Sequence, residues 1–454
     1  MTLDTVARYD QGAVPTVGSR AVVVGASVAG LVAARALADG FEEVVLLERD
    51  PLPNEPAPRD GAPQTHHPHA LLEAGRATLE DFFPGFGESL LSNGGLLLDA
   101  ASEAWHYEQG GYLADAPERM PMYCASRPLF ELVLRERIRA RSTVDLRDER
   151  QFADYQYDAA AERVTGVEYR GPEGERNALD ADLVVDATGR TSRTPAWLGD
   201  HGYPTPAVDE VQIDVEYATT RVERPPDDRR LFLVPPSPPR KRGIYVLPTE
   251  GERWEVLIQG IHGTAAPRDR QEFEAIADEI PPAEPAELVS EHNWVDDELH
   301  HYPFPASRRV HYEHLDRFPD GLAVVGDAVA SFNPIYGQGM SVAALDGLLL
   351  HHTLASGGLD RFGPRYFDRT EDVVDEVWQI AIGSDFEFSE TTGPKPLGTD
   401  AFNAYLRRLL RKAHTDPVLS DAFKRVLLLE RSASSLLGPR IVARVLRPSA
   451  PATG

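Results

Sequence analysis

The 454-residue chain has a single cysteine, Cys124, which excludes an internal disulfide bond and a cysteine-based metal cluster. No uninterrupted apolar run approaches the roughly 18 residues of a membrane-spanning helix, and residues 1–20 lack the basic start and apolar core of a signal peptide. Positive charge is scarce: 46 Lys and Arg against 72 Asp and Glu give a net charge of −26, which argues against nucleic acid or an anionic membrane as the main partner. We therefore expect a soluble, cytoplasmic protein of two or three domains.

The most informative stretch is residues 21–48. Residues 21–24 are apolar and predict a short buried strand, and the run Gly-Ala-Ser-Val-Ala-Gly after them leads into a helix that reaches about Ala38. Residues 44–47 predict a second buried strand, which ends at Glu48. This order indicates a βαβ unit whose first turn leaves backbone N–H groups free at a helix N-terminus, where a pyrophosphate can bind.

Each of the key residues of this βαβ unit has a structural role. Gly25 allows the tight turn, and Gly30 allows the helix to pack closely on the strand. Glu48 lies 23 residues beyond Gly25, where its carboxylate can accept hydrogen bonds from a ribose. Ser27 replaces the usual second glycine, but it is small enough for a phosphate to approach and adds a hydroxyl. The alternative is a turn of a parallel sheet that binds no ligand.

Three histidines follow the first βαβ unit. Residues 49–59 are rich in proline and predict a loop, and His66, His67 and His69 then precede a helix predicted from Ala70 to about Phe83. No carboxylate or cysteine stands at ligand spacing from these histidines. We therefore interpret them as a capped loop and assign no metal ligand in the chain.

A second helix is predicted over residues 127–140, with Ser126 as its cap. Arg127 then stands at a helix N-terminus. There it contacts either a bound anionic cofactor or, alternatively, an ion-pair partner at the surface.

Residues 143–170 predict a strand, a turn and another strand, and Gly171–Gly174 predicts a hairpin turn. Residues 181–190 then predict a buried strand that ends in a glycine turn. In that turn, Asp186 and Gly189 close a loop that can contact a cofactor.

From about residue 205 to residue 317 the chain changes to strict alternation of apolar and polar residues. This pattern predicts half-buried antiparallel strands, which form a sheet with one face free to cover a ligand. The predicted strands lie at 211–217, 230–234, 244–247 and 254–260, with related segments near 96–107, and the proline-rich loop 224–240 is a candidate lid.

At residue 321 the pattern of residues 21–30, a buried strand followed by a glycine turn, returns. A buried strand ends at Gly326 and Asp327, and the glycine-rich loop 331–340 leads into a helix predicted over 341–354. An aspartate in that place can bind a ribose or ribityl hydroxyl, and the loop directs several N–H groups and a helix dipole at one point, which suits a delocalised negative charge. The alternative role of Asp327 is to cap a helix.

Together these segments predict a mixed α/β (α+β) fold with a discontinuous Rossmann-like domain, an inserted antiparallel sheet and a C-terminal helical region. The predicted boundaries are 1–19 for a loose leader, 20–75, 127–200 and 320–355 for the Rossmann-like cofactor domain, 76–126 and 201–319 for the substrate sheet, and 356–454 for the helical region. Residues 401–447 carry ten Lys and Arg against three Asp and Glu. We expect this basic segment to cover the acidic body, the alternative being a membrane or an anionic partner.

Three motifs resemble the single-component FAD-dependent hydroxylases and epoxidases of the p-hydroxybenzoate hydroxylase and squalene epoxidase type. They are G-A-S-V-A-G with Glu48, D-L-V-V-D-A-T-G-R at 182–190, and G-L-A-V-V-G-D-A-V-A-S-F-N-P-I-Y-G-Q-G-M at 321–340. Residues 63–72 are also similar to a segment of polyketide-tailoring enzymes, including the epoxidases of polyether antibiotic biosynthesis. The resemblance implies bound FAD and a flavin hydroperoxide that delivers one oxygen atom to a ring or alkene of a hydrophobic substrate.

The resemblance also implies roles for particular residues. It places Gly25, Ser27, Gly30 and Glu48 on the AMP half, Arg59 and Arg127 beside the flavin or diphosphate, Asp327 at the ribityl diphosphate, and Gly337, Gly339 and Met340 at the pyrimidine edge of the flavin ring. The further predicted cofactor-binding residues are Val28, Ala29, Arg49, Asp186, Gly189, Gly326 and Pro334. The predicted substrate-pocket residues are Phe332, Tyr336, Trp254 and Tyr245. No side chain is assigned a catalytic role, because the flavin carries the reaction.

Some features depart from this family. Only one dinucleotide fingerprint is present, so NAD(P)H would bind transiently or a separate flavin reductase would supply electrons. The W-x-W-x-I-P signature of flavin-dependent halogenases is absent and only four lysines occur, which disfavours halogenation. Some relatives in polyketide pathways keep FAD as a structural element and catalyse a redox-neutral [4+2] cyclisation that forms a decalin. Their FAD motifs would be identical, so this alternative stays open.

Overall fold

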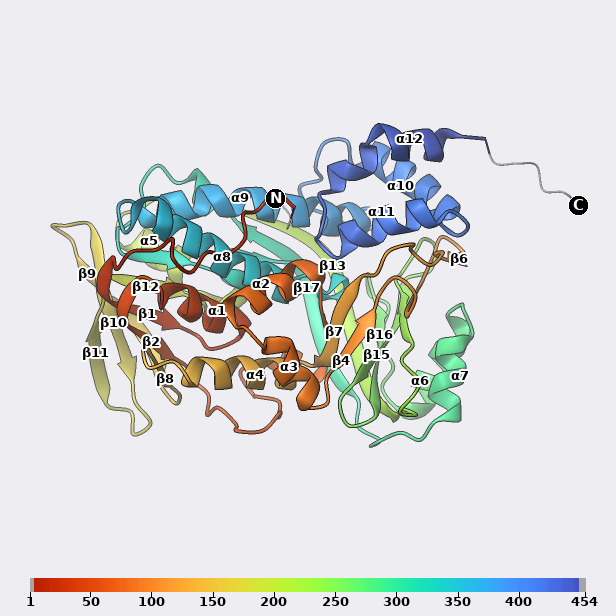
Figure 1. Ribbon diagram of the computed structural model, residues 1–454, viewed down its shortest axis with the longest axis horizontal. Helices are drawn as coiled ribbons and strands as arrows, with labels where there is room; N and C mark the ends of the chain where they lie inside the picture. The colour runs from red at the N-terminus through yellow and green to blue at the C-terminus, as the bar shows by residue number, and fades with distance from the viewer. Residues whose placement is uncertain (1–3, 449–454) are drawn as a thin grey trace, which may run out of the picture.

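The computed structural model describes residues 4–448 and confirms the expected mixed α/β fold (Figure 1). At its centre lies a five-stranded parallel sheet with the strand order β18-β12-β1-β2-β8. The strands come from distant parts of the chain: β1 Gly18–Val24, β2 Phe41–Leu47, β8 Val144–Arg147, β12 Leu183–Asp186 and β18 Leu322–Val324. Because the strands are parallel, their carboxyl ends meet at one edge of the sheet.

Helices cover this sheet, either directly or packed on one another, and its strands are buried and apolar over their central residues. The helices are α1 Val28–Leu37, α2 Glu73–Phe82, α4 Arg127–Arg139 and α8 Gly339–Gly357. α1 contacts β1, α4 and α8, and α2 packs on α8. The predicted start of α4 is confirmed, since the Ser126 hydroxyl accepts a hydrogen bond from the Leu129 N–H at 3.2 Å.

A three-stranded antiparallel sheet, at the left of Figure 1, contacts the parallel sheet through β10 and β12. Its strands are β9 Gln151–Asp158, β10 Arg163–Arg170 and β11 Arg176–Asp180. The predicted turn between β10 and β11 is confirmed by a 2.9 Å hydrogen bond from the Gly171 N–H to the Glu175 carbonyl. β9 was not predicted, because most of its side chains are partly or fully exposed and show no apolar alternation.

The N-terminal segment is more ordered than the predicted loose leader. Residues 4–17 form no helix or strand, but they pack on the body of the protein. The Tyr9 hydroxyl donates to Asp39 at 2.7 Å, and Arg8 pairs with Asp81 at 2.6 Å. Val14 is buried in the core.

The second large layer is an eight-stranded sheet with the order β19-β17-β13-β16-β15-β14-β5-β6, antiparallel except for the pair β14–β5. The strands are β5 Ala104–Glu108, β6 Gly111–Tyr112, β13 Val208–Glu223, β14 Leu231–Val234, β15 Arg242–Thr249, β16 Arg253–Gly260, β17 His300–Val310 and β19 Ala330–Ser331. All four strands predicted between residues 211 and 260 are therefore present.

The strands of this sheet are more buried than the predicted half-buried pattern. β15 and β16 are buried at almost every position. Helices α6 Arg270–Glu279 and α7 Glu284–Glu291 lie beside the sheet at the right of Figure 1, and their side chains pack on one of its faces. The apolar cluster there includes Trp254, Phe273 and Trp294.

A small antiparallel sheet, β3-β7-β4, joins the two layers. It consists of β3 Pro68–Leu71, β4 Leu96–Asp99 and β7 Pro121–Ser126. The helix predicted over 70–83 therefore begins later, at Glu73, because residues 68–71 pair with β7 as a strand. The short helix α3 Phe86–Ser92 packs on α4 and β4, and the short helix α5 Thr194–Asp200 follows the turn after β12 and packs on β9.

The C-terminal region is helical, as predicted: α9 Phe362–Asp385, α10 Thr399–Ala413, α11 Pro417–Leu427 and α12 Pro439–Leu446. Basic side chains in this region contact acids of the body and of the region itself. Arg425 pairs with Glu118 at 2.9 Å, and Arg407 pairs with Glu387 at 2.8 Å. Among the helices within residues 4–448, none combines the length and the apolar character that crossing a membrane requires.

Gly347 determines how closely α8 approaches α1. A Cβ at this position would lie 2.4 Å from Cγ1 of Val32, so we expect Gly347→Ala to lower the free energy of unfolding by about 1–3 kcal/mol. Gly383 in α9 is the matched control, because its added Cβ would make only an ordinary 3.7 Å contact and alanine favours helix by up to about 1 kcal/mol. Urea unfolding followed by circular dichroism measures both variants. Equal stability of Gly347→Ala and the wild type would contradict this close packing.

Candidate functional site

One continuous cavity of about 1200 Å³ begins at the carboxyl edge of the parallel sheet. From there it follows one face of the large sheet, where Leu247 and Leu257 line it, and reaches Phe402 and Leu406 on α10. Ligands of parallel sheets bind outside this carboxyl edge. The cavity is larger than the roughly 300–1000 Å³ of common ligand pockets, so it has room for two molecules.

The turn after β1 has the shape that the glycine spacing predicts. Gly25 has a φ of +102°, and a Cβ there would lie 2.6 Å from the Ala187 carbonyl oxygen. At Gly30, a Cβ would lie 1.7 Å from the carbonyl oxygen of Gly25. A side chain at either position would therefore displace the backbone. Gly25, Ser27, Val28 and Ala29 line the cavity, so the N-terminus of α1 faces it.

Glu48 also lines the cavity, but its carboxylate already has partners in the protein. Its Oε2 accepts the Ala26 N–H at 2.8 Å, and its Oε1 accepts the Asp50 N–H at 3.1 Å. The guanidinium of Arg59 lies 3.3 Å from Oε2. Glu48 therefore holds the glycine turn in place, and its contact with a ribose stays a prediction.

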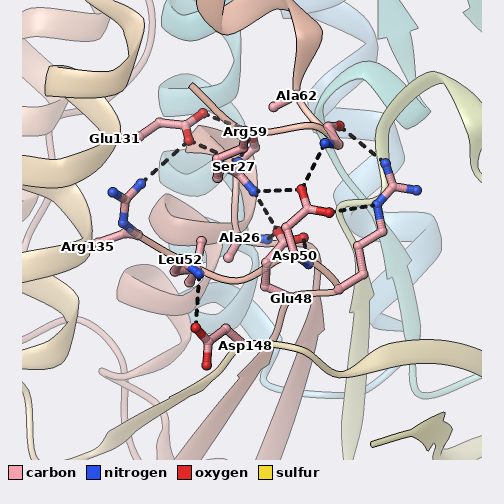
Figure 2. A network of polar contacts seen from close by, with 12 residues as sticks. Ala26, Ser27, Glu48, Asp50, Leu52, Arg59, Ala62, Glu131, Arg135 and Asp148 are labelled. Carbon is pink, nitrogen blue, oxygen red and sulfur yellow. Dashed lines mark hydrogen bonds and ion pairs between the residues drawn. The ribbon is translucent and has the colours of Figure 1, made fainter. Parts of the chain in front are cut away.

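A network of buried charges lies beside this turn, and Figure 2 shows how its side chains converge. Glu131 of α4 contacts three guanidinium groups: those of Arg59 and Arg127 at 2.9 Å and that of Arg135 at 3.7 Å. Burial alone would raise the pKa of Glu131, but the charges of Arg127 and Arg59 outweigh this effect and lower the pKa to about 2. The Ser27 hydroxyl, expected to face a phosphate, donates to Glu131 at 3.0 Å.

This network places Arg59 and Arg127 on the wall of the cavity. The ion pair considered for Arg127 exists, but it is buried beside Glu131 rather than at the surface. Arg59 has a buried Nε without a hydrogen-bond partner within residues 4–448. Arg49 lines the cavity as well and is largely exposed. Glu131 was missed from the sequence, although an acid with Arg127 four residues before it and Arg135 four residues after it was a usable signal.

The turn after β12 places Asp186 and Gly189 on the cavity wall. The carboxylate of Asp186 is occupied by the turn itself, since it accepts hydrogen bonds from the Thr188 N–H at 2.9 Å and from the hydroxyls of Ser192 and Thr194, both at 2.6 Å. Its role in the structure is therefore to hold the turn. Gly189 has a φ of +76°, which favours glycine.

The third glycine turn follows β18. Gly326 has a φ of +65°, and a Cβ there would lie 2.8 Å from that of Ala29, which brings this turn against the first one. Asp327 faces the cavity, and its carboxylate makes no hydrogen bond within residues 4–448. Burial raises the pKa of Asp327, while Arg127 and Arg190 oppose this rise. α8 begins only at Gly339, so Asp327 caps no α-helix.

Pro334, Gly337, Gly339 and Met340 lie on the cavity wall, in the loop before α8 and in its first turn. Phe332, Tyr336 and Tyr245, predicted for the substrate pocket, line the cavity too. Trp254 does not, in contrast to the prediction. It is fully buried on the opposite face of β16, where its Nε1 donates to the Arg230 carbonyl at 3.2 Å.

His67 and His69 line the cavity, and both form hydrogen bonds within the protein. Nδ1 of His67 lies 2.8 Å from the Thr219 hydroxyl, and Nδ1 of His69 lies 2.7 Å from the His67 carbonyl. Burial lowers the pKa of both imidazoles to about 3. Both rings are therefore neutral at physiological pH.

Comparison with known proteins agrees with this geometry. Residues 19–357 match the family described as FAD binding domain. The chain is 32% identical over 442 residues to Protein Rv3254 of Mycobacterium tuberculosis, covering 94% of this chain and 93% of that protein. Among solved structures it is similar to a flavoprotein/dehydrogenase from Cytophaga hutchinsonii (16% identity, 90% and 92% of the two chains covered, TM-score 0.66) and to p-nitrophenol 4-monooxygenase PnpA from Pseudomonas putida DLL-E4 (18% identity, 92% and 99% covered, TM-score 0.62).

Replacement of Glu131 by Gln should destabilise the protein by about 3–5 kcal/mol at neutral pH, because three buried guanidinium groups lose this shared counter-charge and only Arg59 keeps others, those of Glu48 and Asp50. The pKa of Glu131 lies below its ordinary value of 4.5, so its stabilising effect is present above pH 4.5 and is lost as the pH falls toward about 2. The variant should therefore lose part of the acid dependence of stability. Thermal unfolding followed from about pH 7 down to about pH 2 measures both effects.

The matched control is Glu136→Gln, which makes the same change at an exposed position of α4 and should alter stability at neutral pH by less than about 0.5 kcal/mol. Equal effects of the two substitutions would contradict the importance of the buried network.

Proposed function

The chain belongs to the FAD binding domain family, and we propose that it is an FAD-dependent monooxygenase that inserts one oxygen atom into a hydrophobic small molecule. The observation that carries the proposal is the single cavity, which joins the glycine turns at the parallel sheet to an apolar space under the large sheet. PnpA, whose chain has a similar fold, is a monooxygenase by name. A polyketide-type substrate, with epoxidation or hydroxylation as the reaction, is the specific form that we favour from the sequence motifs.

The residues of the dinucleotide half fit FAD. The open turn at Gly25 and the N-terminus of α1 would receive the diphosphate, with Arg59 on the cavity wall beside them. Asp327, whose carboxylate has no hydrogen bond within the described residues, would bind ribityl hydroxyls. The loop from Pro334 to Met340 would hold the flavin ring. Bound FAD supplies the activation of dioxygen and the transfer of one oxygen atom.

The remaining residues of the cavity would act on the substrate by position. The apolar side chains of β15 and β16 would hold it close to the loop before α8, and helices α10 and α11 would limit the entry of water. Within residues 4–448, the turn between β1 and α1 is the one that carries the glycine fingerprint of a dinucleotide site. The sequence contains no second copy of this fingerprint. We therefore propose that NAD(P)H binds transiently or that a separate flavin reductase donates electrons.

Asp327→Ala should lower the FAD content of the purified protein by roughly tenfold, because hydrogen bonds to an ionised group contribute about 1.5–3 kcal/mol. Asp316→Ala, a change of an exposed aspartate eleven positions earlier, is the control and should retain FAD. Flavin released by heating and measured by its absorbance gives the ratio of FAD to protein. Full FAD content in Asp327→Ala would show that the turn after β18 does not hold the cofactor.

The oxygen transfer itself is tested with the yellow holoenzyme. Anaerobic mixing with NADH, NADPH or reduced flavin from a reductase should bleach the flavin, and ¹⁸O₂ should then label the product formed from a panel of aromatic and polyene substrates. If product forms without flavin reduction and without label, the protein is instead a redox-neutral cyclase that keeps FAD as a structural element. An FAD-free protein that stays colourless after incubation with FAD would contradict both functions.

A further inference from the structure

A histidine and a glutamate lie together on β5, near one end of the large sheet. Nε2 of His106 and Oε2 of Glu108 are 2.9 Å apart, and 7% and 20% of the two side chains are exposed. The two residues stand two positions apart on one strand, so their side chains share one face of the sheet. Both line the cavity. They therefore form a polar pair on a wall that is otherwise largely apolar.

The hydrogen bond between these side chains determines what His106 offers the cavity. A carboxylate only accepts hydrogen bonds, so in the neutral imidazole the proton stays on Nε2 and Nδ1 carries a lone pair. Nδ1 has no hydrogen-bond partner within residues 4–448, and it is not sealed inside the protein but keeps accessible surface. His106 therefore presents a hydrogen-bond acceptor that a bound molecule can reach.

The sheet sets the distance from this acceptor to the cofactor half of the cavity. Residues directly opposite each other on neighbouring strands share a face, and one row of such residues crosses the sheet. The row consists of His106 on β5, Leu233 on β14, Tyr245 on β15, Leu257 on β16 and Thr219 on β13. Neighbouring strands lie about 4.8 Å apart, so the row is about 19 Å long.

The Thr219 end of the row lies beside the loop that would hold the flavin ring. Tyr217 stands two positions before Thr219 on β13, and its hydroxyl donates to Oδ1 of Asn333 at 3.4 Å. Asn333 caps the first turn of that loop. The other end lies beside α11, where the rings of His106 and Phe423 are in contact with their centroids 5.8 Å apart. His106 therefore stands at the end of the cavity remote from the flavin loop.

Between its two ends the row offers the cavity no polar atom. Leu233 and Leu257 line the cavity, and the hydroxyl of Tyr245 is enclosed in the protein, so this tyrosine presents only its ring. A molecule that follows the row would meet apolar surface for most of its length and the acceptor of His106 at its end.

The other charged side chains at this remote end are engaged within the protein. Nζ of Lys424 donates to two backbone carbonyls at 3.1 and 2.9 Å, and Arg407 is paired with Glu387 at 2.8 Å. What His106 leaves to a ligand is an acceptor, so the ligand has to donate. A hydroxyl group does so and, unlike an ammonium group, needs no counter-charge when it leaves water.

We propose that Nδ1 of His106 accepts a hydrogen bond from a hydroxyl group at the end of the substrate remote from the flavin. Glu108 is a positioning residue, because it keeps the imidazole proton on Nε2 and so keeps Nδ1 an acceptor. This inference rests on the proposed function, because it names the substrate class of the same cavity. That class is an elongated apolar molecule whose terminal hydroxyl lies about 19 Å from the flavin side of the sheet.

The proposal is tested on the FAD-loaded protein with a long and a short naphthyl alcohol, 10-(2-naphthyl)decan-1-ol and 2-(2-naphthyl)ethanol, and with the methyl ether of each, which has no O–H donor. Binding is read from the change in visible absorption of the flavin, which reports only complexes whose naphthyl ring lies against it. The buffer is mildly alkaline, which favours neutral imidazoles. We expect the long alcohol to bind about threefold to tenfold more tightly than its ether. The short alcohol and its ether should bind equally, because a ring at the flavin leaves the short chain far from His106.

His106→Phe keeps an aromatic ring against Phe423 but removes the acceptor, so the long alcohol should lose its advantage over the ether. The matched control is His262→Phe, the same change at another histidine of the cavity wall, whose Nε2 lies 3.1 Å from the Thr391 hydroxyl. This control should keep the preference for the alcohol. Glu108→Gln should lose part of it, because an amide can donate to Nε2 and shift the imidazole proton to Nδ1.

Three results would overturn the proposal: the long alcohol and its ether bind equally, the short pair shows the same preference as the long pair, or His106→Phe retains the preference. The comparison of the compounds on the wild-type protein decides the question even if a variant does not fold. FAD content is measured in each sample. A wild-type protein without FAD would contradict the proposed function and this inference with it, whereas full FAD content without a hydroxyl preference would overturn this inference alone.

Discussion

The parallel pairing of β12, β1 and β18 is the constraint on which the site depends. Residues near positions 25, 189 and 326 are distant along the chain, but each follows a strand of the same parallel sheet, so all three turns emerge at one edge. Their glycines allow close approach: a side chain at Gly25 would meet the turn after β12, and one at Gly326 would meet Ala29. Without this pairing the cavity would have no dinucleotide half.

Electrostatics divides the cavity into two unlike halves. Near the glycine turns, Arg59 and Arg127 reach the wall and are balanced by Glu131, whose pKa falls to about 2 because cations surround it. In the other half, Asp385 has tyrosine and asparagine partners but no cation in contact, and burial raises its pKa to about 7. The pKa values of two buried carboxyl groups thus move in opposite directions because of what faces them.

The backbone of the fold could be predicted from local patterns, whereas several side-chain roles could not. Apolar runs ending in glycine predicted β1, β12 and β18, and strict alternation predicted β13 to β16, because burial on one or two faces leaves these periods in the sequence. β9 was not predicted because most of its side chains are partly or fully exposed. β3 was not predicted because its pairing with β7 is not local. The predicted contacts of Glu48, Asp186 and Asp327 with a cofactor remain predictions, and the protein uses the first two carboxylates to hold its own turns.

Trp254 and Asp385 show the limit of such reasoning most clearly. A single position along β16 separates the cavity face from the face covered by α6 and α7, so composition alone could not assign Trp254 to one of them. Asp385 stands far along the chain from Asn333 and Tyr336, and only the packing of α9 brings them together.

The net charge of −26 also has a consequence for how an anionic cofactor could enter this cavity. Acidic groups on the surface are screened over about 8 Å at physiological salt, so they exert little force at the buried turn. The nearby guanidinium groups of Arg59 and Arg127 are not screened in this way, and the N-terminus of α1 adds its dipole to theirs. A diphosphate would therefore find hydrogen-bond donors at one end of the cavity, and none on the apolar leucines of β15 and β16. The two ends of this one cavity would in this way bind two different molecules.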